Sequence, residues 1–161
     1  ITPGHALAHR AFEQGITIAE KIAGADPKPV IDDTVPQVVF SFPEAASVGL
    51  TLDQAKARED VVEPKETAYP MLSNARMLMS GEGGSMTVVS GAFANNPDMQ
   101  VVLGVHIVSP IASDLIAEAE QLVGNRVPLA DAARLIHPHP TFSETLGEAL
   151  LKADGRPLHT R

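Results

Sequence analysis

The sequence SMTVVSGAFANNPDMQVVLGVHIVSPIASDLIAEAEQLVG, residues 85–124, decides the fold class of this chain. Its parts 85–93 and 99–108 are rich in Val and other apolar residues, and the turn-forming sequence Ala-Asn-Asn-Pro-Asp separates them. Two such runs joined by a short polar loop predict an antiparallel hairpin. Apolar residues at helical spacing follow Ser109-Pro110, which predicts a helix with Ser109 as its cap and Pro110 in its first turn.

Further strands are predicted upstream of this hairpin. Residues 37–42 and 46–51 are predicted as strands, with a Pro-Glu pair as a break between them. Residues 61–70 are compatible with an irregular or edge strand, because Pro64 cannot donate a hydrogen bond to a neighbouring strand. These strands and the hairpin predict an antiparallel sheet.

Helices are predicted between and after the strands. Thr51 and Gln54 have the spacing of a reciprocal capping box, which predicts a short helix that ends near residue 58. Residues 128–136 and 142–153 carry apolar residues at helical spacing. A series of strands followed by a series of helices predicts an α+β fold, an antiparallel sheet with helices packed on one face.

The chain begins with a separate element. Residues 6–23 carry an apolar stripe at helical spacing, and Gly24 follows in the position that ends many helices. Prolines and charged residues then predict a linker. We therefore predict a terminal helix, a linker and a main domain, in residues 1–24, 25–36 and 37–161.

Composition excludes several classes of protein. The formal net charge of −8 argues against nucleic acid as a partner, because phosphate binding requires a dense Lys and Arg surface. No apolar run approaches the length of a membrane span. The chain has 0 Cys, so it carries neither a disulfide scaffold nor dithiol chemistry of its own. We expect a cytoplasmic protein that does not bind membranes.

The segment HPHPTFSE, residues 137–144, holds the candidate chemistry. A residue before proline is driven out of the helical region, so the two prolines stiffen the backbone around His137 and His139. Glu144 is expected in the first turn of the last helix, close to His139. A carboxylate beside an imidazole orients the ring and stabilises its protonated form, which suits a general base near neutral pH.

Two alternatives to a general base formed by His139 and Glu144 involve different chemistry. Thr141 and Glu144 also have capping-box spacing, so the acid could serve only to cap the helix. Alternatively, His137 and His139 lie two residues apart in an extended segment and would point to the same side. With Glu144 they would supply ligands for a small metal-dependent hydrolase, although a tetrahedral site requires three or four ligands.

Four stretches carry a resemblance that covers nearly the whole chain. They are ALAHRAFEQGITIAEKIAG at 6–24, FPEAASVGLTLDQAKA at 42–57, VLGVHIVSPIASDLIAEA at 102–119 and HPHPTFSETLGEAL at 137–150. Their order and motifs resemble the C-terminal interface domain of the flavin-dependent pyridine nucleotide–disulfide oxidoreductases. Within that family, the second histidine before Pro-Thr and the following Ser-Glu resemble the members that oxidise protein-bound dihydrolipoamide with NAD.

The resemblance implies specific roles. His139 would take a proton from the dithiol substrate, and Glu144 would orient and charge-stabilise it, above the redox disulfide of a partner subunit. The helix in 1–24 would be the last helix of the FAD-binding domain, with Ala8 near FAD. The full-length enzyme would use FAD and NAD, form a homodimer and act on the lipoyl domain of the acyltransferase in 2-oxoacid dehydrogenase complexes.

Several parts of the family's machinery are absent from this sequence. It contains no GxGxxG motif, no cysteine pair and no NAD-binding domain. We therefore expect this chain to be a C-terminal fragment that binds no cofactor and is inactive alone. The full-length enzyme is expected to contribute to cell redox homeostasis. A different hypothesis is a stand-alone dimerisation or scaffold module that has the fold without the chemistry.

Overall fold

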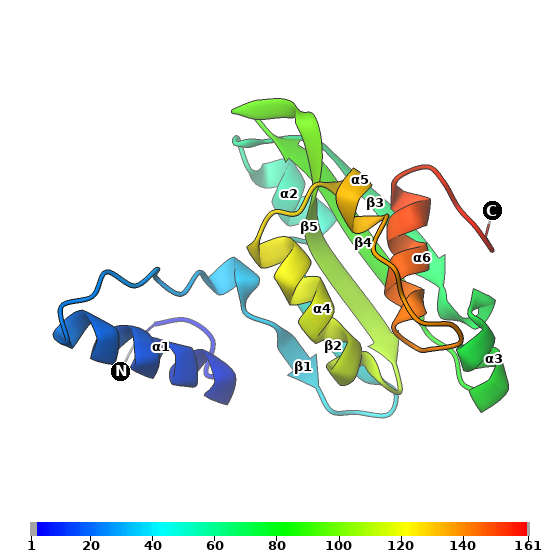
Figure 1. Ribbon diagram of the computed structural model, residues 1–161, viewed down its shortest axis with the longest axis horizontal. Coiled ribbons are helices and arrows are strands. Elements are labelled where there is room, and N and C mark those ends of the chain that lie inside the picture. Colours follow the sequence, from blue (N-terminus) through cyan, green and yellow to red (C-terminus); the bar gives the residue numbers. More distant parts are fainter. Residues whose placement is uncertain (1–2, 161) are drawn as a thin grey trace. The chain divides into compact units, whose positions relative to one another are not determined.

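The computed structural model describes residues 3–160, which form two compact units that divide between Val35 and Pro36 (Figure 1). The first unit contains helix α1 (Ala8–Ile22) and the short 3-10 helix η1 (Asp32–Thr34). The predicted N-terminal helix is confirmed, and Gly24 follows it with a left-handed φ of +87°. Arg10 of α1 donates a hydrogen bond from Nε to Asp32 Oδ1 at 2.8 Å.

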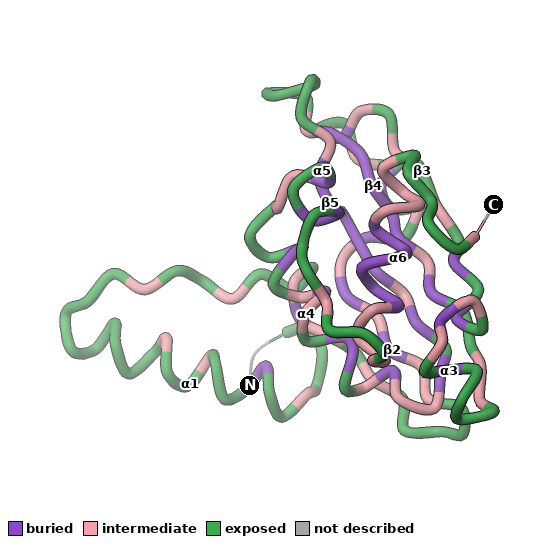
Figure 2. The backbone as a smooth tube through the Cα atoms, turned by 45° about the vertical axis from the view of Figure 1, so that its right-hand side comes forward, coloured by how far each residue is buried: buried purple, intermediate pink, exposed green. Residues whose placement is uncertain are grey.

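Helix α1 has an apolar stripe that the rest of the first unit leaves uncovered (Figure 2). Four large side chains on it are between 52% and 83% exposed: Phe12, Ile16, Ile18 and Ile22. An uncovered apolar stripe of this size is typical of a surface that packs against another protein element.

The second unit is built on one antiparallel sheet (Figure 1). The spatial order is β1-β2-β5-β4-β3, so the predicted hairpin of β4 and β5 lies inside the sheet. The edge strand β3 confirms the prediction for residues 61–70, and its pairing shifts at Pro64, between Val62 and Lys65. The strands are β1 (Gln37–Val39), β2 (Glu44–Gly49), β3 (Val61–Pro70), β4 (Ser85–Phe93) and β5 (Asn96–Ser109).

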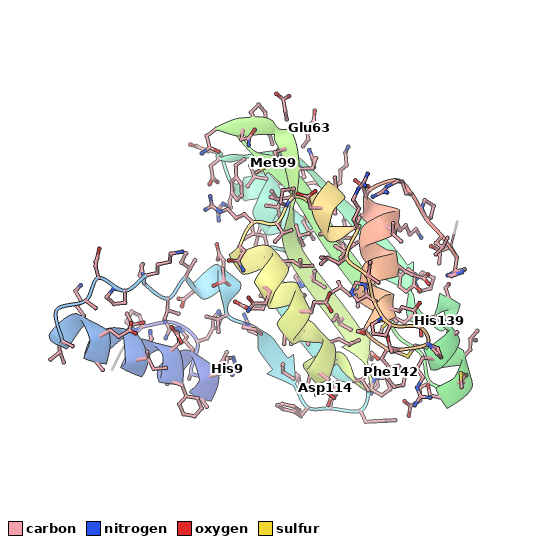
Figure 3. All side chains as sticks on the ribbon, viewed as in Figure 1. His9, Glu63, Met99, Asp114, His139 and Phe142 are labelled. Atoms are coloured by element: carbon pink, nitrogen blue, oxygen red, sulfur yellow. The ribbon has the colours of Figure 1, made fainter. Side chains whose placement is uncertain are left out.

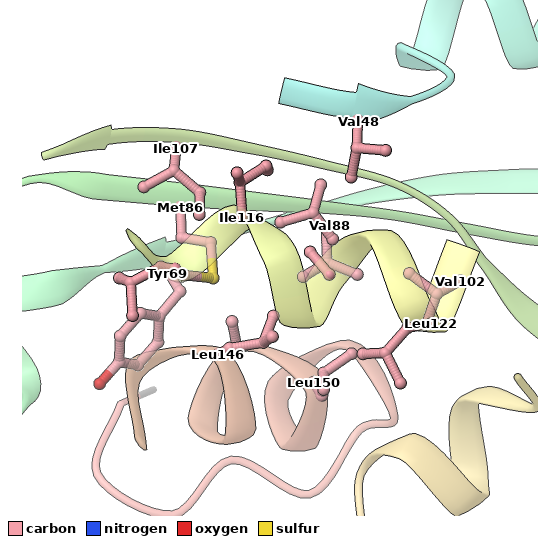
Figure 4. Close-up of a cluster of buried hydrophobic side chains, with 14 of the residues drawn as sticks. Val48, Tyr69, Met86, Val88, Val102, Ile107, Ile116, Leu122, Leu146 and Leu150 are labelled. Atoms are coloured by element: carbon pink, nitrogen blue, oxygen red, sulfur yellow. The ribbon is translucent and has the colours of Figure 1, made fainter. Parts of the chain in front are cut away.

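Three helices cover one face of the sheet, which confirms the predicted α+β class. They are α4 (Ala112–Gly124), α5 (Leu129–Ala132) and α6 (Glu144–Ala153). Leu146 and Leu150 of α6 meet Val88 and Ile107 of the sheet in a dry core (Figure 4). A side chain of this size contributes about 1.5–3 kcal/mol when it is fully buried. This packing fixes the start of α6 against the sheet.

The short helix α2 (Leu52–Ala57) lies against the opposite face. Successive strand residues point to opposite faces, and Val88 belongs to the core under α4 and α6 while Val89 belongs to a second cluster with Ala55 of α2. The predicted capping box is confirmed, because Thr51 Oγ1 accepts from Gln54 N–H and the Gln54 side chain accepts from Thr51 N–H.

Helix α4 begins differently from the prediction. Ser109 still pairs with Glu44 as the last residue of β5, and the helix starts only at Ala112. Glu44 Oε2 instead accepts a hydrogen bond at 2.8 Å from the N–H of Ser113, in the first turn. This bond is the main reason that the pKa of Glu44 lies below its ordinary value. The cap comes from a neighbouring strand and not from the preceding residue.

Other predicted boundaries were displaced. The first strand ends at Val39, and Phe40 and Phe42 are exposed instead of paired. Strand β5 starts at Asn96, which pairs with Phe93, so the hairpin turn is tighter than predicted. Helices α5 and α6 are shorter than predicted, and residues 71–84 form the 3-10 helix η2 (Met71–Ser73) and helix α3 (Ala75–Ser80).

Candidate functional site: a His–Glu general base before the last helix

The segment 137–144 connects α5 to α6 and carries the candidate base. His139 Nδ1 lies 2.9 Å and 3.0 Å from the two carboxylate oxygens of Glu144, the first residue of α6. The expected proximity of these residues is confirmed. The His139 side chain is 64% exposed and that of Glu144 is 17% exposed. Figure 3 labels His139 and Phe142 at the end of the unit where α6 begins.

The pair defines which ring nitrogen can act as a base. A carboxylate only accepts hydrogen bonds, so the proton of a neutral His139 ring lies on Nδ1 and the lone pair lies on Nε2. Partial burial is the largest influence on Glu144 and opposes its ionisation. The hydrogen bonds from His139 and from the backbone of Thr141 outweigh it, and the pKa of Glu144 lies below its ordinary value. The acid is ionised at neutral pH.

Glu144 makes the capping hydrogen bonds with Thr141 at the same time as it binds His139. Glu144 Oε2 accepts from Thr141 N–H at 3.2 Å, and Thr141 Oγ1 accepts from Glu144 N–H at 3.4 Å. The Thr141 hydroxyl donates to the carbonyl of Pro138 at 2.6 Å. The acid is therefore held by the backbone while it binds His139, which restricts where the ring can lie.

A side chain that sequence reasoning missed supports the same segment. Asn74 is 1% exposed, and its Oδ1 caps α3 by accepting from Arg76 N–H and Met77 N–H. Its Nδ2 donates to the carbonyl of Thr141 at 3.2 Å. The Arg76 guanidinium also lies over the Phe142 ring, 5.3 Å from the centroid. An Asn before a helix start was a signal for a cap, but not for a contact 67 residues away.

The metal alternative is not supported by the positions of the histidines. His137 turns to another acid, with Nε2 at 2.7 Å from Glu118 Oε1, so the expectation that it points to the same side as His139 was wrong. Across the described residues, no group of three or more His, Cys, Asp and Glu side chains is placed to hold a metal ion. The two histidines form two separate His–Glu pairs.

Two further histidines have structural partners. His106 Nε2 lies 3.1 Å from the carbonyl of Leu50, as expected for a histidine within a sheet. His159 lies in the segment after α6, and its Nδ1 is 2.6 Å from Glu148 Oε1. The other Glu148 oxygen accepts from Tyr69 Oη at 2.9 Å. The pKa of Tyr69 lies above its ordinary value, mainly because its hydroxyl is buried and secondly because it donates this hydrogen bond to Glu148. Glu148 therefore links the segment after α6 to Tyr69 of β3.

Ala8, the predicted FAD neighbour, is the first residue of α1 and is exposed. Leu7 precedes it without a side-chain cap, and the first turn has no acidic residue. Free amides at a helix start are compatible with a polar group of a cofactor. The role of Ala8 stays a prediction.

These features define an α+β domain that presents an acid-oriented imidazole and holds no nucleophilic cysteine. The chain belongs to the family described as pyridine nucleotide-disulphide oxidoreductase, dimerisation domain, whose model matches residues 35–150. The match includes all five strands of the sheet and both His–Glu pairs of segment 137–144.

Two of the similar proteins are dihydrolipoyl dehydrogenases. The chain is 40% identical to that of Bacillus subtilis over 157 residues, 97% of this chain and 32% of the relative. It is 40% identical to that of Cupriavidus necator over 161 residues, 99% of this chain and 32% of the relative. The crystal structure of LpdA from Mycobacterium tuberculosis matches with a TM-score of 0.80 and 29% identity, over 91% of this chain and 31% of that chain.

This chain thus spans about a third of the length of the curated relatives that it matches. In the part of the chain that the structure describes, the helices lack the length and apolar content needed to cross a membrane.

Proposed function

We propose that this chain is the interface part of a dihydrolipoyl dehydrogenase and that it supplies His139 and Glu144 as the general base for a partner subunit. The single observation that carries this proposal is the hydrogen bond of His139 Nδ1 to both oxygens of Glu144, at 2.9 Å and 3.0 Å, in an exposed segment. Identity of 40% to two dihydrolipoyl dehydrogenases supports the choice of substrate.

The chemistry follows from the free lone pair on His139 Nε2. This nitrogen takes the S–H proton of one thiol of dihydrolipoamide, and the resulting thiolate attacks a sulfur of the redox disulfide. The old S–S bond breaks, a mixed disulfide forms, and the second cysteine leaves as a thiolate. Glu144 stabilises the imidazolium formed by the transfer. The second thiol of dihydrolipoamide, as a thiolate, then displaces the first cysteine from the mixed disulfide, which closes the lipoyl disulfide and leaves the cysteine pair reduced. FAD, when bound in the full-length protein, would supply the chemistry that passes the electron pair from the cysteine pair to NAD.

The cysteines for this reaction come from outside the chain, because its sequence contains none. A two-fold homodimer would place the base of one subunit over the disulfide of the other. The dimerisation-domain family and the exposed apolar side chains support such an association. Val39 and Val108, on edge and central strands, are 62% and 45% exposed. The partner substrate would be the lipoyl domain of a 2-oxoacid dehydrogenase complex.

The test uses a chimera in which this chain replaces the matching third of the Bacillus subtilis enzyme. FAD content and dimer mass are measured first, and then NAD-dependent oxidation of dihydrolipoamide. His139→Ala should lower kcat by about 10²–10⁴-fold, because it removes a positioned base, while FAD content stays unchanged.

The matched control is His159→Ala, which removes another exposed histidine paired with a glutamate of α6. It should leave turnover as in the parent chimera. Equal turnover with and without His139 would contradict the base and favour a domain that only mediates dimerisation.

A further inference from the structure

The second His–Glu pair is largely shielded from solvent on the histidine side. The His137 side chain is 9% exposed, and its Nε2 lies 2.7 Å from Glu118 Oε1 of α4. The hydrogen bond to Glu118 is the largest influence on His137 and raises its pKa, although burial of the ring opposes it. This ring is therefore linked to α4 by a charge-assisted hydrogen bond, which is stronger than a neutral one.

The same ring lies against the helix that begins with Glu144. A Cβ atom added at Gly147 would lie 2.5 Å from His137 Nδ1 and 2.8 Å from its Cε1. Real Cβ atoms do not approach other atoms so closely, so only glycine leaves room for the ring there. Gly147 and Glu144 are three residues apart and neighbours on one face of α6. The imidazole of His137 thus touches helix α6, which carries Glu144.

We propose that His137 is a positioning residue for the His139–Glu144 pair. The ring of His137 is held between Glu118 and Gly147, and it thereby fixes the segment that presents His139 to Glu144. The role in catalysis rests on the proposed function, whereas the effect on the orientation of His139 does not. The connection is short, because only Pro138 separates the two histidines and its ring removes one backbone rotation. Movement of the buried ring is therefore transmitted to the exposed one.

A purely structural role for His137 has a different consequence. If the ring only filled space between α4 and α6, any side chain of suitable volume would serve, and His139 would keep its orientation. If it positions the segment, loss of the link to Glu118 changes the hydrogen bond of His139 even when the space is refilled. The tautomer of His139 reports that bond directly, because Glu144 holds the proton on Nδ1.

The experiment uses the 161-residue chain with ¹⁵N-labelled histidine. Long-range proton–nitrogen spectra at a pH where His139 is neutral give the ratio of its Nδ1–H to Nε2–H tautomers. The decisive variant is the double substitution His137→Ala with Gly147→Ala, because the new Cβ enters the vacated space and alanine favours the helix. Thermal melting confirms that this variant folds.

We expect the tautomer ratio of His139 to fall by about 10-fold or more in the double variant, as a charge-assisted hydrogen bond is weakened. His137→Gln, whose amide can still donate to Glu118, should restore most of the ratio, and the control His159→Ala should leave it unchanged. A wild-type ratio in the folded double variant would overturn the proposal. Turnover of the chimera does not enter this measurement, so failure of the enzyme assignment is detected separately.

Discussion

Two histidines of one segment each pair with a glutamate, and the two pairs differ in exposure. The His139 side chain is 64% exposed beside Glu144, whereas the His137 side chain is 9% exposed beside Glu118. The partner of the first lies five residues away, and the partner of the second lies 19 residues away on another helix. Two similar pairs can thus have different uses: the exposed one can exchange a proton with a ligand, and the buried one can hold the backbone.

Among the changes that compare the two pairs, loss of the acid of the exposed pair should have the largest effect. Glu144→Gln in the chimera removes the charge that stabilises the imidazolium, and we expect turnover with dihydrolipoamide to fall by about 10- to 100-fold, the equivalent of one charge-assisted hydrogen bond. Steady-state assays at neutral pH measure it. Glu118→Gln, the same change in the buried pair, should lower turnover less. The reverse order would contradict the division of roles between the two pairs.

The second prediction compares the same pairs by stability. His137→Ala leaves Glu118 without its partner and opens a space beside Gly147, so we expect a loss of about 2–3 kcal/mol in the free energy of unfolding. His139→Ala removes only an exposed ion pair and should cost about 0–1 kcal/mol. Urea unfolding of the chain, followed by circular dichroism, measures both values. Similar losses for the two variants would show that the less exposed pair does not contribute more to the free energy of unfolding than the exposed pair.

Much of this site could be predicted from the sequence, because its central contact is local. His139 and Glu144 are five positions apart, and the two members of the α2 capping box are three positions apart, so spacing alone placed them. The hairpin of β4 and β5 was predicted for the same reason. These elements need no knowledge of the rest of the fold.

Contacts between distant segments could not be predicted in this way. Sequence spacing gives no information on the bond from Asn74 to Thr141 or on the pairing of His137 with Glu118. Ser109-Pro110 is a plausible helix cap, but pairing of β2 with β5 extends the strand through Ser109 and brings Glu44 to the helix instead. Tertiary packing decided these positions.

The third prediction concerns Asn74, which holds the segment at Thr141. Asn74→Ala removes the cap of α3 and the hydrogen bond to the Thr141 carbonyl, and we expect a loss of about 2 kcal/mol in the free energy of unfolding. The chain is compared with Asn74→Asp, which keeps the cap but cannot donate to the carbonyl. The aspartate variant should lose less than the alanine variant. If both variants are as stable as the parent, the hydrogen bonds of Asn74 do not contribute to stability.

The smallest effect is a pH dependence confined to the buried pair. Glu118 and, at longer range, Glu144 raise the pKa of His137 above the value of about 6.5 found in unfolded chains. Its stabilising contribution is fully present below about pH 6.5 and is lost as the pH rises through the raised pKa. We therefore expect the stability difference between the parent chain and His137→Gln to shrink with rising pH. A difference that grows with pH would contradict the charged pair.

The central claim, that this domain supplies its base to a partner subunit, is tested most directly by mixing two inactive chimeras. One carries His139→Ala with intact redox cysteines, and the other carries His139 with both redox cysteines replaced by serine. If the base acts across the dimer, co-expression restores one working site per mixed dimer, about a quarter of all sites after random pairing. If mixed dimers purified with two different tags remain inactive, the base does not serve the partner subunit, and the account is wrong.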